Sequence, residues 1–298
     1  MPLPREAEPY ARSYRTNTRH PALGCLKLCG EVKSNRLFPI SQVIGAIPNR
    51  FALAGGWIDQ PFVSRLNPKP PGSMVVVSLE PNFRAMDRSG CATGTRSVAT
   101  KLWKGRLPRR PADQLVRELY EAENEGKTHP SGSQDMIGLI YPGISRLDYD
   151  FGVNGGIFPS HIESINRPGI GRWLESVLQV LPIEPRPEGY DPLGEKHLEP
   201  NWIRRLGQTG KDCFDAIRHK DINALGASMN ECMACWEKIL PQVLHHPVIK
   251  LNLKAILSAY QSRYPGAMYS GCGGGYLFVV SRDPVAGAFH VNVRIATK

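Results

Sequence analysis

The stretch PNRFALAGGWID, residues 48–59, joins an apolar segment to a pair of glycines and ends on a carboxylate. Residues 42–53 predict a β-strand that enters a turn at Gly55 and Gly56. Because glycine has no Cβ atom, the backbone of such a turn can approach a ligand closely. The stretch therefore predicts a binding turn at the end of a strand.

Three side chains of this stretch suit a sugar-like ligand. Asp59 can accept hydrogen bonds from ligand hydroxyls, Trp57 offers an apolar face to a sugar ring, and Arg50 can neutralise developing negative charge. The alternative is an ordinary turn with an exposed aspartate and a tryptophan that packs in the core.

A second loop, residues 89–95, is rich in small and hydroxyl side chains and precedes a predicted helix that includes Leu102. Backbone N–H groups at a helix N-terminus bind phosphate, and a threonine hydroxyl can ligate Mg²⁺. The loop differs from the Walker pattern, which ends in Gly-Lys-Ser/Thr, and an ordinary capped helix start is the alternative. The candidate phosphate-binding residues are Ser89, Gly90, Thr93, Gly94 and Thr95.

Two carboxylates lie beyond this loop. Asp135 follows Gly132-Ser133-Gln134 and opens the apolar segment 136–141. It predicts a base or an orienting group for a substrate hydroxyl, and the alternative is a helix N-cap. Glu123, at the end of a predicted helix, can complete a metal site with Thr95 or be a solvated charge.

A second glycine loop, residues 271–275, precedes a strongly apolar strand predicted over 276–281. Consecutive glycines allow a backbone to pack closely against a partner, and a tight turn is the alternative. The candidate ligand-contacting residues of this loop are Gly271, Gly273, Gly274 and Gly275.

The composition excludes some classes of protein. The 298 residues carry a formal net charge of +10 and their apolar stretches are strand-length, so we expect no membrane span. The N-terminus lacks the apolar core of a secretory signal, and the odd, scattered cysteines predict reduced thiols and a cytoplasmic protein. The charge favours a solvated surface and an anionic small ligand over nucleic acid, because aromatic residues do not alternate with the basic ones.

The order of predicted elements indicates the fold class. Strands are predicted over 74–79, 276–281 and 289–295, and short strands broken at Gly152 and at Gly155-Gly156 are predicted over 147–158. Helices are predicted over 112–123, 210–219, 222–240 and 248–263. A proline-rich connection over 182–200 marks a boundary. This order predicts an α+β protein with two lobes.

Together, the four segments resemble the GHMP kinase superfamily, and within it the sugar kinases of the fucokinase and heptose-phosphate kinase type. The family's Pro-x-Arg and Gly-Gly-x-x-Asp-x-Pro are matched by Pro48, Arg50, Gly55, Gly56, Asp59 and Pro61. Its acidic motif Gly-x-Gln-Asp is matched by Gly132, Gln134 and Asp135, with a similar continuation over 141–148. Its C-terminal glycine loop is similar to residues 271–280. The resemblance covers roughly residues 46–298.

The resemblance implies the two-lobed α+β fold of GHMP kinases. An N-terminal lobe over 46–198 would resemble ribosomal protein S5 domain 2, and a C-terminal lobe over 199–298 would be ferredoxin-like. Residues 1–45 have no counterpart and are expected to be an irregular extension. The implied activity is transfer of a phosphoryl group from ATP, with Mg²⁺, to the anomeric hydroxyl of a sugar or sugar phosphate.

The resemblance also implies a role for each candidate residue. Asp135 and Arg50 would be the catalytic pair, and Asp59 would bind the sugar beside Gly55, Gly56 and Trp57. Thr95 and Glu123 would hold Mg²⁺. The loops 89–95 and 271–275 would surround the phosphates of the nucleotide.

Three positions of the phosphate loop depart from the family. Ala92 replaces a glycine, Gly94 replaces a hydroxyl residue, and Arg96 stands where a small residue is usual. The spacing between the first two motifs is also short, which predicts that strands beside the adenine are missing. These departures leave open a non-catalytic member of the fold that binds a ligand or partner, and the basic charge leaves a nucleic-acid-binding protein as a third reading.

Overall fold

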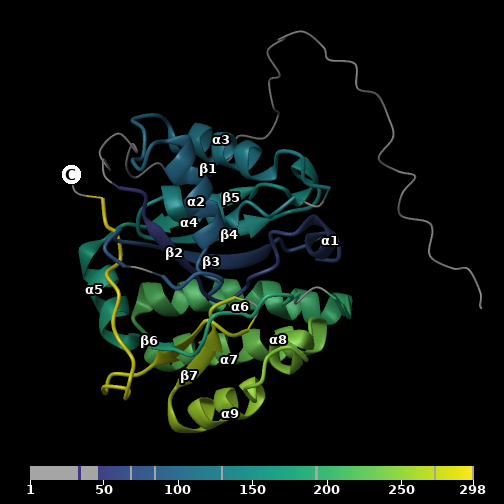
Figure 1. The fold of residues 1–298 in the computed structure, drawn as a ribbon, viewed down its shortest axis with the longest axis vertical. Coiled ribbons are helices and arrows are strands. Elements are labelled where there is room, and N and C mark those ends of the chain that lie inside the picture. Colours follow the sequence, from purple (N-terminus) through teal and green to yellow (C-terminus); the bar gives the residue numbers. More distant parts are fainter. Residues whose placement is uncertain are drawn as a thin grey trace, which may run out of the picture. The chain divides into compact units, whose positions relative to one another are not determined.

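The computed structural model describes residues 33–34, 46–67, 69–83, 85–128, 130–191, 194–271 and 273–296. These residues form two β-sheets and the helices around them, as Figure 1 shows. The mixture of helices and largely antiparallel sheets confirms the predicted α+β class.

The five-stranded sheet has the strand order β1-β5-β4-β3-β2. Its strands are β1 (Lys33–Ser34), β2 (Asn49–Ala52), β3 (Gly72–Leu79), β4 (Ile144–Tyr149) and β5 (His161–Ile165). All residues of β3 are buried, and its β-branched valines pack well on a pleated surface that is covered on both faces. The register places Arg50 of β2 opposite Ser78 of β3, and all residues of β2 are buried.

Helices cover both faces of this sheet (Figure 1). On one face α4 (Gln134–Ile140) packs against β2 and β3, and α2 (Thr93–Leu102) and α3 (Ala112–Asn124) pack against α4. On the other face α6 (Pro200–His219) packs against β3 and β4, and α7 (Ile222–Ile239) packs against α6 and β7. Helix α6 begins ten residues before the predicted helix 210–219. A Cβ atom on its Gly210 would lie 2.0 Å from the Ser73 carbonyl oxygen, so glycine allows α6 to lie directly on β3. Asp221 caps α7 by accepting hydrogen bonds from the backbone N–H groups of Asn223 and Ala224.

The three-stranded sheet has the order β6-β8-β7, with β8 antiparallel to both neighbours. Its strands are β6 (Leu178–Pro182), β7 (Gly266–Tyr269) and β8 (Tyr276–Val280), and α7 and α9 (Leu253–Arg263) pack against it. Strand β6 follows α5 (Pro168–Val177) and precedes residue 198, so this sheet combines strands from both sides of the predicted lobe boundary. The boundary itself stays a prediction.

Several connections position the site. Residues 80–83 and 85–92, between β3 and α2, contain neither helix nor strand, in line with the short spacing of the first two motifs. The described residues of the proline-rich connection, 183–191 and 194–199, also contain none. The two short helices are α1 (Pro61–Ser64) and α8 (Gln242–His245). No helix in the described part of the chain is long and apolar enough to cross a membrane.

Further predicted elements differ from the structure. The segment 150–158 forms turns and a 3₁₀ helix (Asn154–Gly156) rather than a strand, because glycines with positive φ interrupt it. Helix α9 begins after Asn252, whose side chain caps it, and not at residue 248. Within the N-terminal segment predicted to be irregular, Lys33–Ser34 form β1, which is parallel to β5, and residues 42–45 of the first predicted strand lie outside the described residues.

The predicted C-terminal strand over 289–295 forms isolated bridges instead of a continuous ladder. Phe289 pairs with Val180 in the three-stranded sheet, and Val293 pairs with Leu79 in the five-stranded sheet. The segment crosses from one sheet to the other, so it cannot follow either strand for long. Arg294, which is buried, donates hydrogen bonds to the carbonyl oxygens of Leu139 and Ile140 at the C-terminal end of α4. It thus anchors the helix that begins beside Asp135.

Candidate active site

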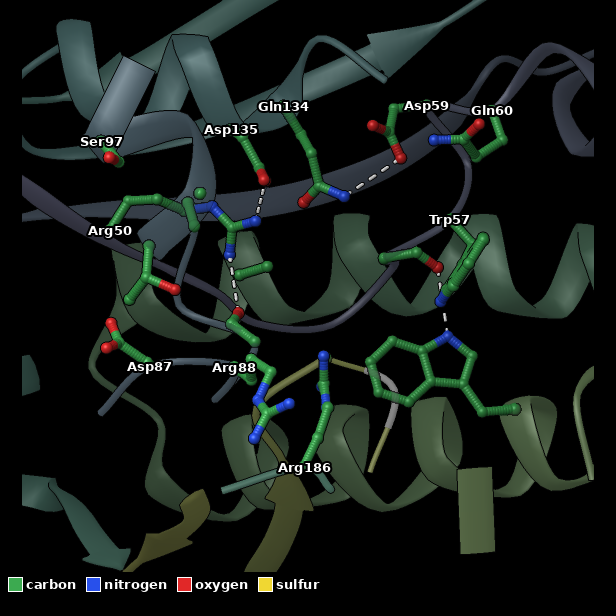
Figure 2. Close-up of a pocket in the computed structure, with 18 residues that line it drawn as sticks. Arg50, Trp57, Asp59, Gln60, Asp87, Arg88, Ser97, Gln134, Asp135 and Arg186 are labelled. Atoms are coloured by element: carbon green, nitrogen blue, oxygen red, sulfur yellow. Dashed lines mark hydrogen bonds and ion pairs between the residues drawn. The ribbon is translucent and has the colours of Figure 1, made fainter. Parts of the chain in front are cut away.

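The predicted motifs surround one cavity of about 580 Å³. The predicted residues that line it are Arg50, Gly56, Trp57, Asp59, Gly90, Thr93, Gly94, Asp135 and Gly271. The first, second and third motifs meet here from β2, from α2 and from α4, and Figure 2 shows their side chains together.

Arg50 and Asp135 form an ion pair at the centre of the cavity (Figure 2). The Arg50 side chain is 5% exposed and the Asp135 side chain 25%. Arg50 Nη1 also donates to the Gly90 carbonyl oxygen at 3.4 Å, and Thr95 Oγ1 donates to Asp135 Oδ2 at 3.3 Å. Burial lowers the pKa of Arg50 to about 10, partly offset by nearby acidic groups, so the guanidinium stays charged at neutral pH.

The position of Asp135 decides whether it is a helix N-cap. Helix α4 begins at Gln134, its N-cap residue is Ser133, and Asp135 lies in the first turn with its carboxylate directed to Arg50. Asp135 is therefore not a helix N-cap. A carboxylate held by one charged and one hydroxyl donor can still take up or orient a substrate proton on its exposed side.

Asp59 lies at the other end of the cavity and is 1% exposed. Gln134 Nε2 donates to its Oδ1 at 3.2 Å, and its Oδ2 is buried with no hydrogen-bond partner among the described residues. A Cβ atom on Gly132 would lie 1.7 Å from that Oδ2, which explains the glycine of the acidic motif. Burial raises the pKa of Asp59 to about 6 against the opposing charge of Arg50. The orphaned oxygen can accept a ligand hydroxyl.

The Gly55-Gly56-Trp57 turn forms the wall beside Asp59. Gly55 does not line the cavity, because its Cα faces the Ser73 carbonyl oxygen. Trp236 of α7 donates from Nε1 to the Gly56 carbonyl oxygen at 3.1 Å and lines the cavity together with Trp57. Trp57 itself has a φ of 82°, a strained value for a bulky residue. The turn thus presents indole surface next to a buried carboxylate.

The loop 89–95 leads into the first turn of α2, which has no side-chain cap. Thr93 and Gly94 in this first turn line the cavity, and backbone N–H groups at an uncapped helix N-terminus can bind an anion. Ser89 is fully buried and does not line the cavity; its carbonyl oxygen accepts a hydrogen bond from Ser270 Oγ at 2.6 Å. A Cβ atom on Gly90 would lie 1.9 Å from the Ser270 carbonyl oxygen. The loop is thus held against the residue that precedes the second glycine loop.

Among the described residues of the second glycine loop, only Gly271 lines the cavity. Gly273 faces the Val243 carbonyl oxygen, Gly275 faces the backbone of Ser89, and Gly274 lies beside Arg186. These three glycines therefore hold the loop in place, and their contact with a nucleotide stays a prediction.

The predicted metal ligands lie near the cavity without lining it. Thr95 contacts Asp135, and Glu123 forms an ion pair with Lys127 at 3.5 Å through Oε1. Glu123 Oε2 is buried and has no hydrogen-bond partner among the described residues. Within that same part of the chain, no group of three or more His, Cys, Asp or Glu side chains can hold a metal by itself. An orphaned carboxylate oxygen fits Mg²⁺, which keeps several water or phosphate ligands.

The sequence matches no family model and no curated protein significantly. Among solved structures, a galactokinase from Lactococcus lactis in complex with galactose matches with a TM-score of 0.58, 11% identity, and 85% of this chain and 94% of that chain covered. A mevalonate kinase matches at 0.53 with 12% identity, covering 85% of this chain and 99% of the other. A mevalonate kinase from Methanococcus jannaschii matches with a TM-score of 0.51 and 11% identity. The match covers 80% of this chain and 90% of that chain.

The chain has the GHMP kinase fold. The resemblance of the motifs is therefore confirmed at the level of the fold, and the predicted sugar-kinase chemistry rests on the site.

One departure from the GHMP motif places a non-glycine residue in a strained backbone conformation. Ala92, which stands where the family has glycine, is the N-cap residue of α2 and has φ 56° and ψ 31°, the left-handed conformation. We expect Ala92→Gly to raise the free energy of unfolding by roughly 0.5–1 kcal/mol, because glycine adopts this conformation without strain. Denaturant unfolding measures the change.

The matched control is Ala99→Gly in the same helix. Ala99 has ordinary helical geometry and is fully buried, so this change lowers the stability by roughly 1 kcal/mol or more. If both glycine variants are destabilised alike, Ala92 is not strained.

Sequence reasoning missed five polar residues of the cavity wall and one indole. The cavity is also lined by Trp236 and by the polar residues Gln60, Asp87, Arg88, Ser97 and Arg186. Trp236 belongs to the core and is 1% exposed. No sequence signal indicated Arg186, since it lies in the proline-rich connection and reaches the site only through the fold.

Proposed function

We propose that this protein is a kinase that transfers a phosphoryl group from a nucleoside triphosphate to a hydroxyl of a sugar or sugar phosphate. The observation that carries the proposal is the Arg50–Asp135 pair, set between an uncapped helix N-terminus and a buried, half-unsatisfied carboxylate. Phosphoryl transfer depends on positioning and on charge stabilisation, and these groups supply both.

The acceptor would bind between Asp59 and the tryptophans. Asp59 Oδ2 accepts a hydroxyl, Gln134 fixes the carboxylate, and Trp57 covers an apolar sugar face. The galactose complex of the L. lactis galactokinase supports a sugar as acceptor, as far as a shared fold can.

The chemistry would take place at the Arg50–Asp135 pair. Asp135 orients the acceptor hydroxyl and takes up its proton as the new O–P bond forms, while Arg50 stabilises the negative charge of the transferring group. Thr95 and Glu123 would hold Mg²⁺, which neutralises the charge of the donor phosphates when bound. Thr95 also keeps the Asp135 carboxylate in place through its hydroxyl.

We expect a non-hydrolysable ATP analogue to bind with measurable heat, and more tightly with Mg²⁺ than without it. Calorimetry is the measurement. Glu123→Gln keeps the shape of the side chain but removes its charge, so it lowers the Mg²⁺ dependence, whereas Glu121→Gln on the exposed face of the same helix leaves it unchanged. The absence of heat at millimolar nucleotide contradicts the kinase and favours a ligand-binding protein with this fold.

We further expect the product to be a sugar 1-phosphate. This expectation rests on the Gly55-Gly56-Trp57-x-Asp59-x-Pro61 pattern, which resembles kinases that act on the anomeric hydroxyl. Coupling between phosphorus and the anomeric proton in ³¹P NMR identifies the position. A phosphate on a primary hydroxyl or on a non-sugar alcohol shows the assignment to be wrong.

A non-catalytic protein is the second candidate, and the left-handed Ala92 in the phosphate loop is the observation that favours it. The calorimetric experiment and a turnover assay together distinguish the two. The predicted cytoplasmic location stays a prediction.

A further inference from the structure

Two arginines that the proposed chemistry does not use form one wall of the cavity. Arg88 and Arg186 both line it, and the Arg186 backbone N–H donates to the Arg88 carbonyl oxygen at 3.2 Å. In Figure 2 both lie beneath Arg50, whereas Trp57, Asp59 and Gln60 lie together on the other side. The cavity therefore has a cationic end and an acceptor end.

Arg186 connects the two glycine loops. Its Nε donates to the Gly273 carbonyl oxygen at 2.7 Å and its Nη2 to the Ser270 carbonyl oxygen at 2.9 Å. A Cβ atom on Gly90 would lie 2.7 Å from the same Nη2. The guanidinium thus lies directly on the loop that leads into α2.

Neither arginine is neutralised within the described residues. Arg50 has Asp135 as its charge partner, but no ion pair of Arg88 or Arg186 is formed there. Asp87 is the one carboxylate that lines this end, and it is exposed. This end of the cavity thus has two guanidinium groups, one carboxylate and an uncapped helix N-terminus. Together they create a positive potential that suits a multiply charged anion.

Among the described residues, the lining of this end contains no apolar slot for a nucleobase. The lining residues between 87 and 97 are glycine, alanine, small hydroxyl residues, Asp87 and Arg88, so Ala92 is their largest apolar side chain. Both indoles that line the cavity, Trp57 and Trp236, belong to the acceptor end through Gly56. Base-specific sites are normally apolar slots with a few fixed polar groups, and the strandless connection 85–92 builds none among the described residues.

We infer that the phosphoryl donor is held by its polyphosphate, between Arg88, Arg186 and the first turn of α2, and that its nucleoside contributes little to binding. This inference rests on the proposed function for the use of the polyphosphate, but the binding site itself is testable without turnover.

Calorimetry compares Mg²⁺–tripolyphosphate, a non-hydrolysable ATP analogue and adenosine on the full chain. We expect the first two to bind with dissociation constants within about 10-fold of each other, a difference of about 1.4 kcal/mol, and adenosine not to compete. In turnover, ATP, GTP, CTP and UTP should have kcat/KM values within about 10-fold. ATP binding more than about 100-fold tighter than tripolyphosphate, or competition by adenosine, overturns the inference.

Variants locate the site. Arg88→Gln should weaken tripolyphosphate binding roughly 10-fold without loss of stability, since the described residues give its side chain no hydrogen bond. Arg186→Gln should weaken it at least as much and also loosen the loops. Arg205→Gln, which changes an exposed arginine of α6 paired with Glu231, is the control and should bind like the parent. If Arg88→Gln and Arg186→Gln both bind tripolyphosphate like the parent, the two arginines do not hold the polyphosphate and the inference is wrong.

The outcomes separate this inference from the proposed function. Tripolyphosphate binding without phosphoryl transfer to any sugar refutes the kinase and leaves the polyphosphate site standing. Transfer from ATP alone, with no tripolyphosphate binding, supports the kinase and refutes the inference.

Discussion

Asp135→Asn should lower the turnover of sugar phosphorylation by roughly 10²–10⁴-fold, because the amide keeps the shape of the carboxylate but cannot take up the hydroxyl proton. Affinity for the nucleotide should change little, since Asp135 faces Arg50 and Thr95 rather than the backbone donors of α2. A coupled assay of ADP release gives the turnover, and calorimetry gives the affinity.

The same substitution should also lower the stability. Arg50 is almost fully buried and loses its only charge partner among the described residues. Breaking a fully buried pair costs about 3–5 kcal/mol, and the partial exposure of Asp135 reduces this to about 1–3 kcal/mol. Denaturant unfolding therefore has to accompany the kinetics, so that lost turnover is measured on folded protein.

Asp113→Asn is the matched control. Asp113 also lies in the first turn of a helix, α3, but it is exposed and away from the cavity. It should leave turnover unchanged. An Asp135→Asn protein that folds, binds nucleotide and turns over near the parental rate removes Asp135 from the mechanism.

The site shows which features a sequence can predict. Arg50, Asp59 and Asp135 were recognised because each belongs to a motif that contains glycines. Close contacts in the structure require such glycines, as for Gly132 against the Asp59 side chain. The central strand β3 was recognised because its valines form a continuous apolar run. In these cases the local sequence carries the constraint that the structure imposes.

Other features depend on contacts between distant segments. Arg186 lies in a proline-rich connection, and only the pairing of that connection with Gly275 and Arg88 brings it to the cavity. The C-terminal segment has the composition of a strand, but it bridges two sheets through Phe289 and Val293. Local propensity is outweighed there by the tertiary path of the chain.

Asp59→Asn should strongly weaken sugar binding while stabilising the protein. Asp59 Oδ2 is an ionisable acceptor without a partner, and each hydrogen bond from a ligand to a charged group is worth about 1.5–3 kcal/mol. If two sugar hydroxyls donate to the carboxylate, the amide should weaken the sugar roughly 10²-fold or more. Calorimetry with the sugar, with and without nucleotide, measures the loss.

The gain in stability follows from the pKa of Asp59. Burial raises it from 3.8 to about 6, so between these values the folded state retains a proton that the unfolded state has released. The free energy of unfolding therefore falls as the pH rises through this window. Above pH 6 the ionised, buried Asp59 destabilises the folded protein by the full amount, about 3 kcal/mol. Asp59→Asn should thus raise the free energy of unfolding by up to about 3 kcal/mol at pH 8 and by little at pH 4.

Asp148→Asn separates this effect from a general effect of removing a buried charge. Asp148 is also largely buried, but it accepts hydrogen bonds from Ser73 and Arg146. Its removal should lower the stability and leave sugar affinity unchanged. The parental protein should in addition lose sugar affinity as the pH falls below about 6, where Asp59 takes up its proton, whereas Asp59→Asn should show no such dependence. A substitution at Asp59 that destabilises the protein as Asp148→Asn does would mean that the carboxylate supports the fold and not the ligand.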